Sequence, residues 1–429
     1  MLASTARNWH SAPGHMGLRL DRKLLRTVME KPPTSTTADS ALPPVAPKVP
    51  VISRRELLHR LSPFATRSTP RALWYFFSDL ALYAIAIAGV LFLPNLPSKL
   101  LSSVLAGLAL GRLFSFAHNA AHENLAENRK LNRVMAYVAF TPFFYSYRLW
   151  AFEHHKWHHA LLNDQKPDAY KPFSKAEFDR LPAWRRVLER FYRAPNVVGW
   201  GAYYLIERHF RTKIYPPEYV VGPYRRVAWI NTAWLAAYAF LFGMFLIQAP
   251  AYSVNLTISE SLALGFLIPF LVFEVADGFT LYAQHTDPLI PWFRDGGVNR
   301  DGPGRGDLLS VHLQVPLVYR WWSHETHAHP VHHLLPGIPF FRVKAAQQEL
   351  DRLLGPWAIV RRLSLAWWFD TMRRCKLYDW DKHQWLDFSG NPTGPSLLPR
   401  LRALEALSVS GARTSDVDAT TPAVSPCRG

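Results

Sequence analysis

The chain has 429 residues, 49% of them hydrophobic, and its 49 lysines and arginines outnumber its 32 aspartates and glutamates. Such an excess is typical of proteins that bind nucleic acid or anionic lipid, or that face the inner side of a membrane. The charge distribution favours the membrane, because Lys99 is the only basic residue in 72–111 and residues 227–293 contain none. No basic helix is interleaved with aromatic residues, which argues against nucleic-acid binding.

The N-terminal part differs in composition from the rest. Residues 1–70, which include PPTSTTADSALPPVAPKVP, are rich in proline, serine and threonine and lack an apolar period. Such a stretch cannot bury a core, so we expect a disordered tail. The first strongly apolar run begins near Leu73, too far along for a cleavable signal peptide, and the apolar segments should stay in the mature protein. Residues 391–429 are likewise predicted to form a disordered tail.

Four apolar segments are each about long enough to cross a ~30 Å hydrocarbon layer as helices. They are residues 73–94, 97–117, 227–248 and 256–277. The short uncharged links NLPS and APAYSVN predict two hairpins. Nearly all basic residues then lie on one side, which the positive-inside rule makes cytoplasmic. The sequence therefore predicts an all-α integral membrane domain over 71–390, since a soluble helical protein would not explain one charge asymmetry shared by four segments.

Eleven of the 18 histidines fall in three short stretches on the predicted cytoplasmic side. In FAHNAAHEN, His118 and His122 follow the second apolar segment four residues apart, so on a helix both rings project from one face. In WAFEHHKWHHALLND, His155, His158 and His159 have i, i+3, i+4 spacing, and His154 is a second candidate one residue earlier.

The third stretch repeats this spacing. In HETHAHPVHHLLPGIPF, the triplet consists of His329, His332 and His333. His285, in LYAQHTDP, lies about two helical turns beyond the fourth apolar segment, where a continuing helix could bring it to the clusters.

These clusters predict metal binding. Several histidines on one face repel each other as cations and cost desolvation energy as buried neutral rings, unless a metal ion accepts their lone pairs. About nine imidazoles exceed the four ligands of a zinc site, which implies two ions. Imidazole suits iron, copper and nickel as well as zinc.

The order HxxxH, HxxHH and HxxHH resembles the three histidine boxes of the membrane fatty acid desaturase and hydroxylase superfamily, over about residues 70–350. QHTDPLIPWF, VHLQVP and HHLLPGIPFF are similar to acyl-lipid desaturases of the omega-6 (delta-12) branch. The resemblance implies a four-span enzyme with a cytosolic helical cap, a diiron centre, and O2-dependent removal of two hydrogens from an acyl chain. The implied iron ligands are His118, His122, His155, His158, His159, His285, His329, His332 and His333.

The resemblance leaves the second box open by one residue. If His154 coordinates instead of His155, the box reads HxxxHH, a spacing also found in the superfamily. We favour His155, and expect His154, His312 and His324 to lie beside the ligands without binding a metal themselves.

The resemblance also implies the partners. The substrate would be an acyl lipid or an acyl thioester. No heme-binding HPGG motif is present, so we expect electrons from a separate ferredoxin or cytochrome b5-like donor. A bacterial inner membrane, with both termini and the active site cytoplasmic, is the expected location. A hydroxylase or ketolase acting on a carotenoid, sterol or alkane is the alternative, because these reactions need the same ligands.

Overall fold

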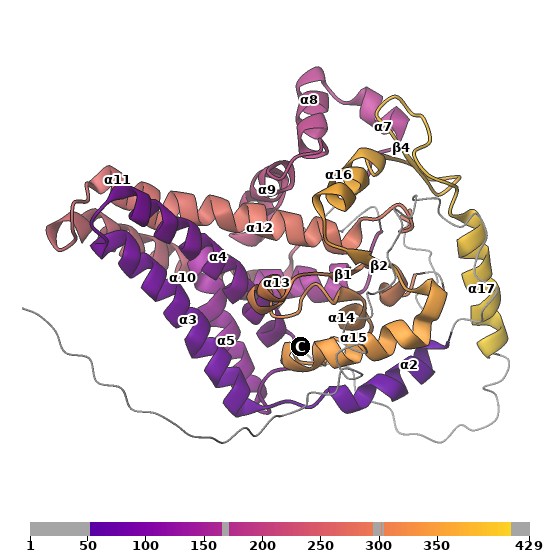
Figure 1. Cartoon of the computed structure of the whole chain (residues 1–429), viewed down its shortest axis with the longest axis horizontal. Coiled ribbons are helices and arrows are strands. Elements are labelled where there is room, and N and C mark those ends of the chain that lie inside the picture. The colour runs from indigo at the N-terminus through magenta and orange to yellow at the C-terminus, as the bar shows by residue number, and fades with distance from the viewer. Residues whose placement is uncertain (1–51, 165–170, 295–301, 303, 413–429) are drawn as a thin grey trace, which may run out of the picture. The chain divides into compact units, whose positions relative to one another are not determined.

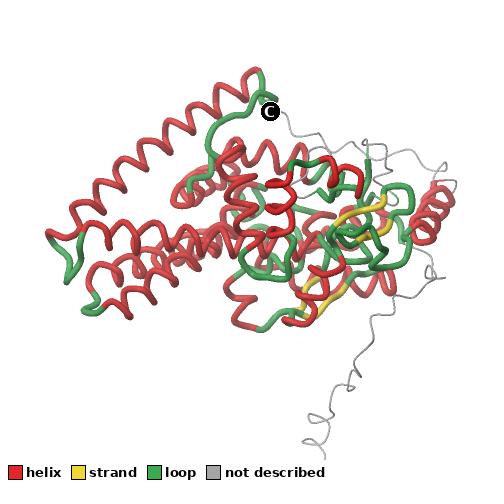
Figure 2. The backbone as a smooth tube through the Cα atoms, turned by 90° about the horizontal axis from the view of Figure 1, so that it is seen from above, coloured by secondary structure: helices red, strands yellow, loops and turns green. Residues whose placement is uncertain are grey.

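The computed structural model describes residues 52–164, 171–294, 302 and 304–412, with side chains through residue 406. All of these belong to one unit, Pro43–Gly429. They are mostly helical, and each of the four strands among them has three residues (Figures 1 and 2).

Four helical runs are long and apolar enough to cross a membrane, and each overlaps a predicted segment. They are α3 (Thr69–Phe92), α4 (Leu96–Ala121), α10 (Gly222–Gln248) with the turn η5 (Ala249–Ala251), and the series α11 (Ile258–Leu262), η6 (Ala263–Leu267) and α12 (Ile268–His285). Capping interactions stabilise the N-termini of α4 and α11. The Asn95 side chain accepts from the Ser98 backbone N–H, and Thr257 forms a capping box with Glu260.

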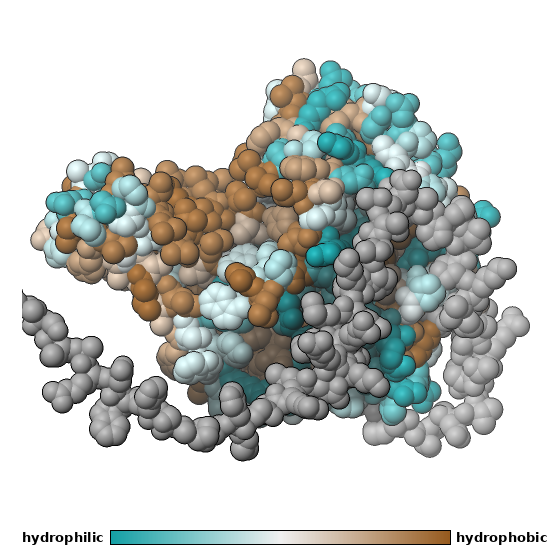
Figure 3. All heavy atoms as spheres, in the orientation of Figure 1, coloured by the Kyte–Doolittle hydropathy of each residue, from teal (hydrophilic) through white to brown (hydrophobic). Residues whose placement is uncertain are grey.

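The outer faces of these helices are apolar. Phe77 and Ile85 on α3, and Phe240 and Leu241 on α10, are each more than 60% exposed. In Figure 3 the surface over the long helices is almost continuously hydrophobic. Patches of this size are unfavourable in water, so the helices fit a lipid environment.

The most buried of the four runs is α4, which packs between α3 and α12. Gly107 permits the close approach to α12, because a Cβ there would lie 2.6 Å from the Pro269 carbonyl oxygen and from Val272 Cβ. The two helices that end at metal-binding candidates, α4 and α12, are therefore packed directly against each other.

The remaining elements gather at one end of the long helices (Figure 1). The strands β1 (His312–Gln314) and β2 (Val360–Arg362) pair in parallel, and β3 (Leu377–Asp379) and β4 (Gln384–Leu386) pair antiparallel. The helices near the histidines are α5 (Arg129–Phe140), α6 (Tyr147–Glu153), η3 (His154–His158), α9 (Gly199–Tyr203), η4 (Tyr204–Lys213), α13 (Leu317–Trp322), α14 (His329–Leu334) and α15 (Phe340–Leu354). The other helices and turns are α2 (Arg54–Leu61), η1 (Ser62–Phe64), η2 (Thr141–Phe143), α7 (Lys175–Arg180), α8 (Ala183–Tyr192), η7 (Gly306–Leu308), η8 (Gly355–Trp357), α16 (Leu365–Arg374) and α17 (Leu398–Ala412).

The structure differs from the predicted tails at their inner edges. Within 1–70, α2 buries Leu57 and Leu61 completely in a core shared with α14 and α15. Within 391–429, α17 places Leu404 in the same core. The composition of these segments did not reveal the contacts, because a few leucines at helical spacing are enough to pack a short helix against the rest of the core. The tail predictions for 1–51 and 413–429 lie outside the described residues.

Candidate metal centre

Four elements bring the histidines together. His118 lies in the last turn of α4 and His122 caps its C-terminus, while His285 is the last residue of α12. The second histidine stretch follows α6, and α14 carries the third. Helix ends suit this purpose, because their side chains can reach beyond the apolar spans while the helix axis stays fixed in the packing.

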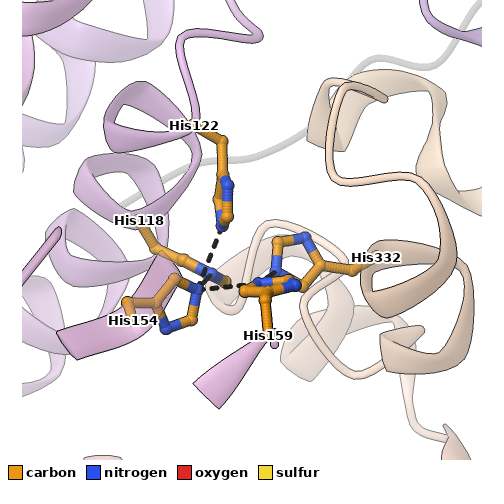
Figure 4. Close-up of side chains that lie close together, drawn as sticks. All are labelled: His118, His122, His154, His159 and His332. Carbon is orange, nitrogen blue, oxygen red and sulfur yellow. Dashed lines mark hydrogen bonds between the residues drawn. The ribbon is translucent and has the colours of Figure 1, made fainter. Parts of the chain in front are cut away.

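Five histidines form the first group, which Figure 4 shows with their rings pointing toward one another. At its centre, His154 Nε2 lies 2.9 Å from His118 Nε2 and 3.0 Å from the Nε2 atoms of His122 and His159. His159 Nε2 is in turn 3.1 Å from His332 Nε2.

Four histidines, namely His158, His285, His329 and His333, form the second group. His329 Nε2 lies 2.8 Å from His285 Nε2 and 2.9 Å from His333 Nε2. The ring of His158 is 4.6 Å from that of His285, centroid to centroid. His332 and His333, although adjacent in sequence, therefore belong to different groups.

The donor geometry fits a metal ion in each group. A neutral imidazole carries one N–H, so the Nε2 atom of His154 cannot satisfy three neighbouring nitrogens by hydrogen bonding. Two ligand nitrogens held ~2.1 Å from one ion, at right angles to each other, are about 3.0 Å apart. The observed separations of 2.8–3.1 Å are those of nitrogens that share an ion.

The electrostatic environment keeps the rings neutral. Burial lowers the pKa of these imidazoles well below the ordinary value of 6.5, and nearby histidines lower each pKa further. The rings to which this applies outside the apolar spans are His122, His154, His159, His329, His332 and His333. Neutral rings offer the lone pairs that a metal requires.

One predicted ligand takes a different place. Of the nine, His155 alone is missing from the two groups, and His154 stands in its position. The reason is a π-helical turn over His154–His158, in which the His159 backbone N–H donates to the His154 carbonyl oxygen at 2.9 Å. The wider turn aligns residues five apart, whereas the sequence argument assumed α-helical spacing. His155 is exposed, with its ring 4.6 Å from that of His122.

The other two histidines placed beside the ligands bind carboxylates. His312 Nδ1 lies 2.6 Å from Asp351 Oδ2, and His324 Nε2 lies 2.6 Å from Asp79 Oδ2. Asp79 also accepts a hydrogen bond from Arg112 Nε at 2.7 Å. His324 borders a small cavity together with His118, His329 and His332.

Sequence reasoning missed the role of Asp79. It is completely buried in α3, and through Arg112 and His324 it ties two long helices to the loop before α14. An acidic residue inside an apolar segment was the available signal, because an ionisable group there needs a partner.

A second cavity, lined mainly by apolar and aromatic side chains, also adjoins both histidine groups. His118 and His154 of the first group and His158, His285 and His329 of the second face it. Phe114, Tyr145 and Trp150 form much of the wall beside the rings. A largely apolar cavity that ends at two clusters of metal-binding nitrogens can hold a hydrocarbon chain against a metal centre.

Comparison with known proteins gives consistent matches. A family model described as "Fatty acid desaturase" matches residues 95–363. The "Omega-6 fatty acid desaturase, chloroplastic" of Glycine max is 26% identical over 290 residues, which cover 66% of this chain and 63% of the plant protein. The "sn-1 oleoyl-lipid 12-desaturase" of a Picosynechococcus species is 23% identical over 364 residues, covering 83% of this chain and 98% of the relative.

The name of a third relative includes an electron donor, ferredoxin. The "sn-1 acyl-lipid omega-3 desaturase (ferredoxin)" of a Synechocystis species is 23% identical over 310 residues, covering 68% of this chain and 77% of the relative. The aligned region spans 58–63% of the length of the soybean and spinach relatives.

Proposed function

Since the chain belongs to the fatty acid desaturase family, we propose that it is an O2-dependent desaturase that introduces a cis double bond into the acyl chain of a membrane lipid. The observation that carries the proposal is the cavity that adjoins both histidine groups. The names of the relatives favour the omega-6 or delta-12 position.

The nine grouped histidines would hold two iron ions, one in each group. Bound iron would supply the oxidising power to remove hydrogen from an unactivated methylene, which no side-chain acid or base possesses. In the balanced reaction, a CH2–CH2 unit, O2, two electrons and two protons give CH=CH and two waters. The proposed ligands are the nine histidines of the two groups, so His154 takes the place of His155 in the first group.

The residues of the chain position the substrate and exclude water. Phe114, Tyr145 and Trp150 border the cavity beside the rings, and a methylene chain can be held only by such packing because it offers no hydrogen-bonding group. The contact of Asp79 with His324 and Arg112 would hold the loop before α14, and with it His329, against the long helices.

The topology proposed is two membrane hairpins, α3 with α4 and α10 with α11–α12, and a cytoplasmic cap that carries the histidines. Both termini would be cytoplasmic, which the positive charge of the segments outside the spans supports, and the membrane would be a bacterial inner membrane. A ferredoxin is the favoured electron donor because a relative carries it in its name, and a cytochrome b5-like protein is the other candidate.

The test is gas chromatography with mass spectrometry of total lipids from a host that lacks polyunsaturated acids, with the chain and a plant-type ferredoxin expressed together. A new diene derived from oleate is expected. The His332→Ala variant should insert into the membrane equally well and yield none, because its ring belongs to the first group. Unchanged acyl chains from an iron-loaded protein would refute the proposal, and a gain of oxygen would establish a hydroxylase instead.

A further inference from the structure

The walls of the cavity differ in their exposure. Deep lining residues such as Trp200, Tyr204 and Trp292 are 4% exposed or less. The partly exposed lining residues gather on α12 and on the α13 turn, and they are Ala276, Thr280, Leu281, Trp322 and Thr326. The other two that keep some exposure are Phe114 of α4 and Arg208 of η4. The opening of the cavity therefore lies mainly between α12 and α13.

This opening is at the level of the apolar spans. Ala276 and Thr280 belong to the fourth candidate span, nine and five residues before His285. At 1.5 Å per residue they lie about 13 and 7 Å below that histidine along the helix axis. A molecule that passes between α12 and α13 must therefore come from the side of the helical bundle.

The rim of the opening is apolar and faces outward. On α13, Leu317 and Val318 are 74% and 77% exposed, and Trp321 is 56% exposed. The Arg112 guanidinium lies 4.2 Å from the centroid of the Trp321 ring, which fixes that ring on α4. Figure 3 shows apolar side chains at α13 beside the hydrophobic surface of the long helices. Tryptophan with exposed aliphatic neighbours is typical of a segment at the membrane–water interface.

Trp322, the last residue of α13, lies between this rim and the cavity. Its Nε1–H donates to the Leu108 carbonyl oxygen at 2.6 Å, and its ring lies across Gly111 of α4. A Cβ at position 111 would meet Trp322 Cζ2 at 2.6 Å, so only glycine lets the ring lie this close to the helix. On the other side, the Thr280 hydroxyl is 3.3 Å from the Tyr319 hydroxyl.

We propose that the opening between α12 and α13 is a lateral portal through which the acyl chain of an intact glycerolipid enters from the bilayer while its head group stays outside. The proposal rests on the proposed function, because that function makes an acyl chain the occupant of the cavity. What it adds is the route of entry, between α12 and α13, whereas a water-soluble acyl thioester would have to cross the apolar rim from the aqueous side.

The experiment uses the full chain, loaded with zinc so that no turnover occurs, in lipid nanodiscs that contain a phosphatidylcholine with a diazirine on its acyl chain. Illumination should label the cavity residues of the wild type. Ala276→Phe and Thr280→Phe narrow the portal and should lower this labelling several-fold. Leu271→Phe adds a ring to the outer face of the same helix, where Leu271 is 40% exposed, and should label as the wild type does.

Trp322→Ala gives a test in the opposite direction and guards against misfolding of the narrowed variants. Removing the Trp322 ring widens the opening and should speed labelling several-fold, with zinc content unchanged. Equal labelling of all four variants and the wild type would overturn the portal. The portal would also be overturned if the two narrowing substitutions left labelling unchanged while a soluble acyl thioester added as a competitor abolished it. A wild type that labels in its cavity but forms no diene when iron-loaded would refute the desaturase proposal and leave the portal standing.

Discussion

Replacing His154 by alanine should lower metal binding, whereas replacing the adjacent His155 should leave it unchanged. His154 Nε2 lies within 3.0 Å of the corresponding atoms of His118, His122 and His159, so His154→Ala removes the ring at the centre of the first group, which we propose to be a metal ligand. Loss of a partner that only orients a ligand already costs 10–100-fold in metal affinity, so loss of a ligand should cost more than ~100-fold. His155 is exposed, and His155→Ala should change the stability by less than about 0.5 kcal/mol.

The assay is metal analysis of purified variants after reconstitution with iron and dialysis, together with lipid analysis of the expressing host. His154→Ala should bind about one ion per chain instead of about two and form no diene. His155→Ala should bind as the wild type does and remain active. Full metal content in His154→Ala together with metal loss in His155→Ala would refute the assignment of His154 and restore His155 as the ligand.

Three further predictions concern stability. Asp79→Asn leaves the buried Arg112 without its carboxylate and should cost about 3–5 kcal/mol, seen as a lowered midpoint of thermal unfolding, whereas Glu56→Gln in an exposed pair should leave the midpoint nearly unchanged. Burial, and then the charge of Lys213, lower the pKa of His209 from 6.5 to about 3. As the pH falls from 6.5 toward 3, the unfolded chain therefore binds a proton at His209 that the folded chain does not bind. The free energy of unfolding should fall in this window by up to about 1.4 kcal/mol per pH unit. His209→Asn should reduce that slope in acid unfolding curves. Chelation of the metals should lower the unfolding midpoint, and added zinc should restore the midpoint without restoring diene formation; an unchanged midpoint would contradict metal binding.

The sequence alone determined the features that depend on local spacing. The four apolar runs follow from composition over about twenty residues, and all four are present. The histidine stretches follow from i, i+3, i+4 repeats, and eight of nine predicted ligands lie in the two groups. The fourth apolar segment was predicted to end near Asp277 with its helix continuing toward His285, and α12 does end at His285. In this continuation Tyr145 donates to Asp277, and Gln284 donates to the Thr326 carbonyl oxygen.

Only the tertiary structure decided how the histidines are divided. His332 and His333 point about 100° apart on α14, so one faces the ring of His159 and the other that of His329. The first group contains His154 and not His155 because His154–His158 form a π-helical turn, whose spacing no α-helical pattern contains. The contact between His324 and Asp79 joins residues 245 positions apart, and Arg112 binds the same carboxylate from 33 positions after it. Local patterns fix which residues can share a helix face, whereas the packing of separate helices fixes which faces meet.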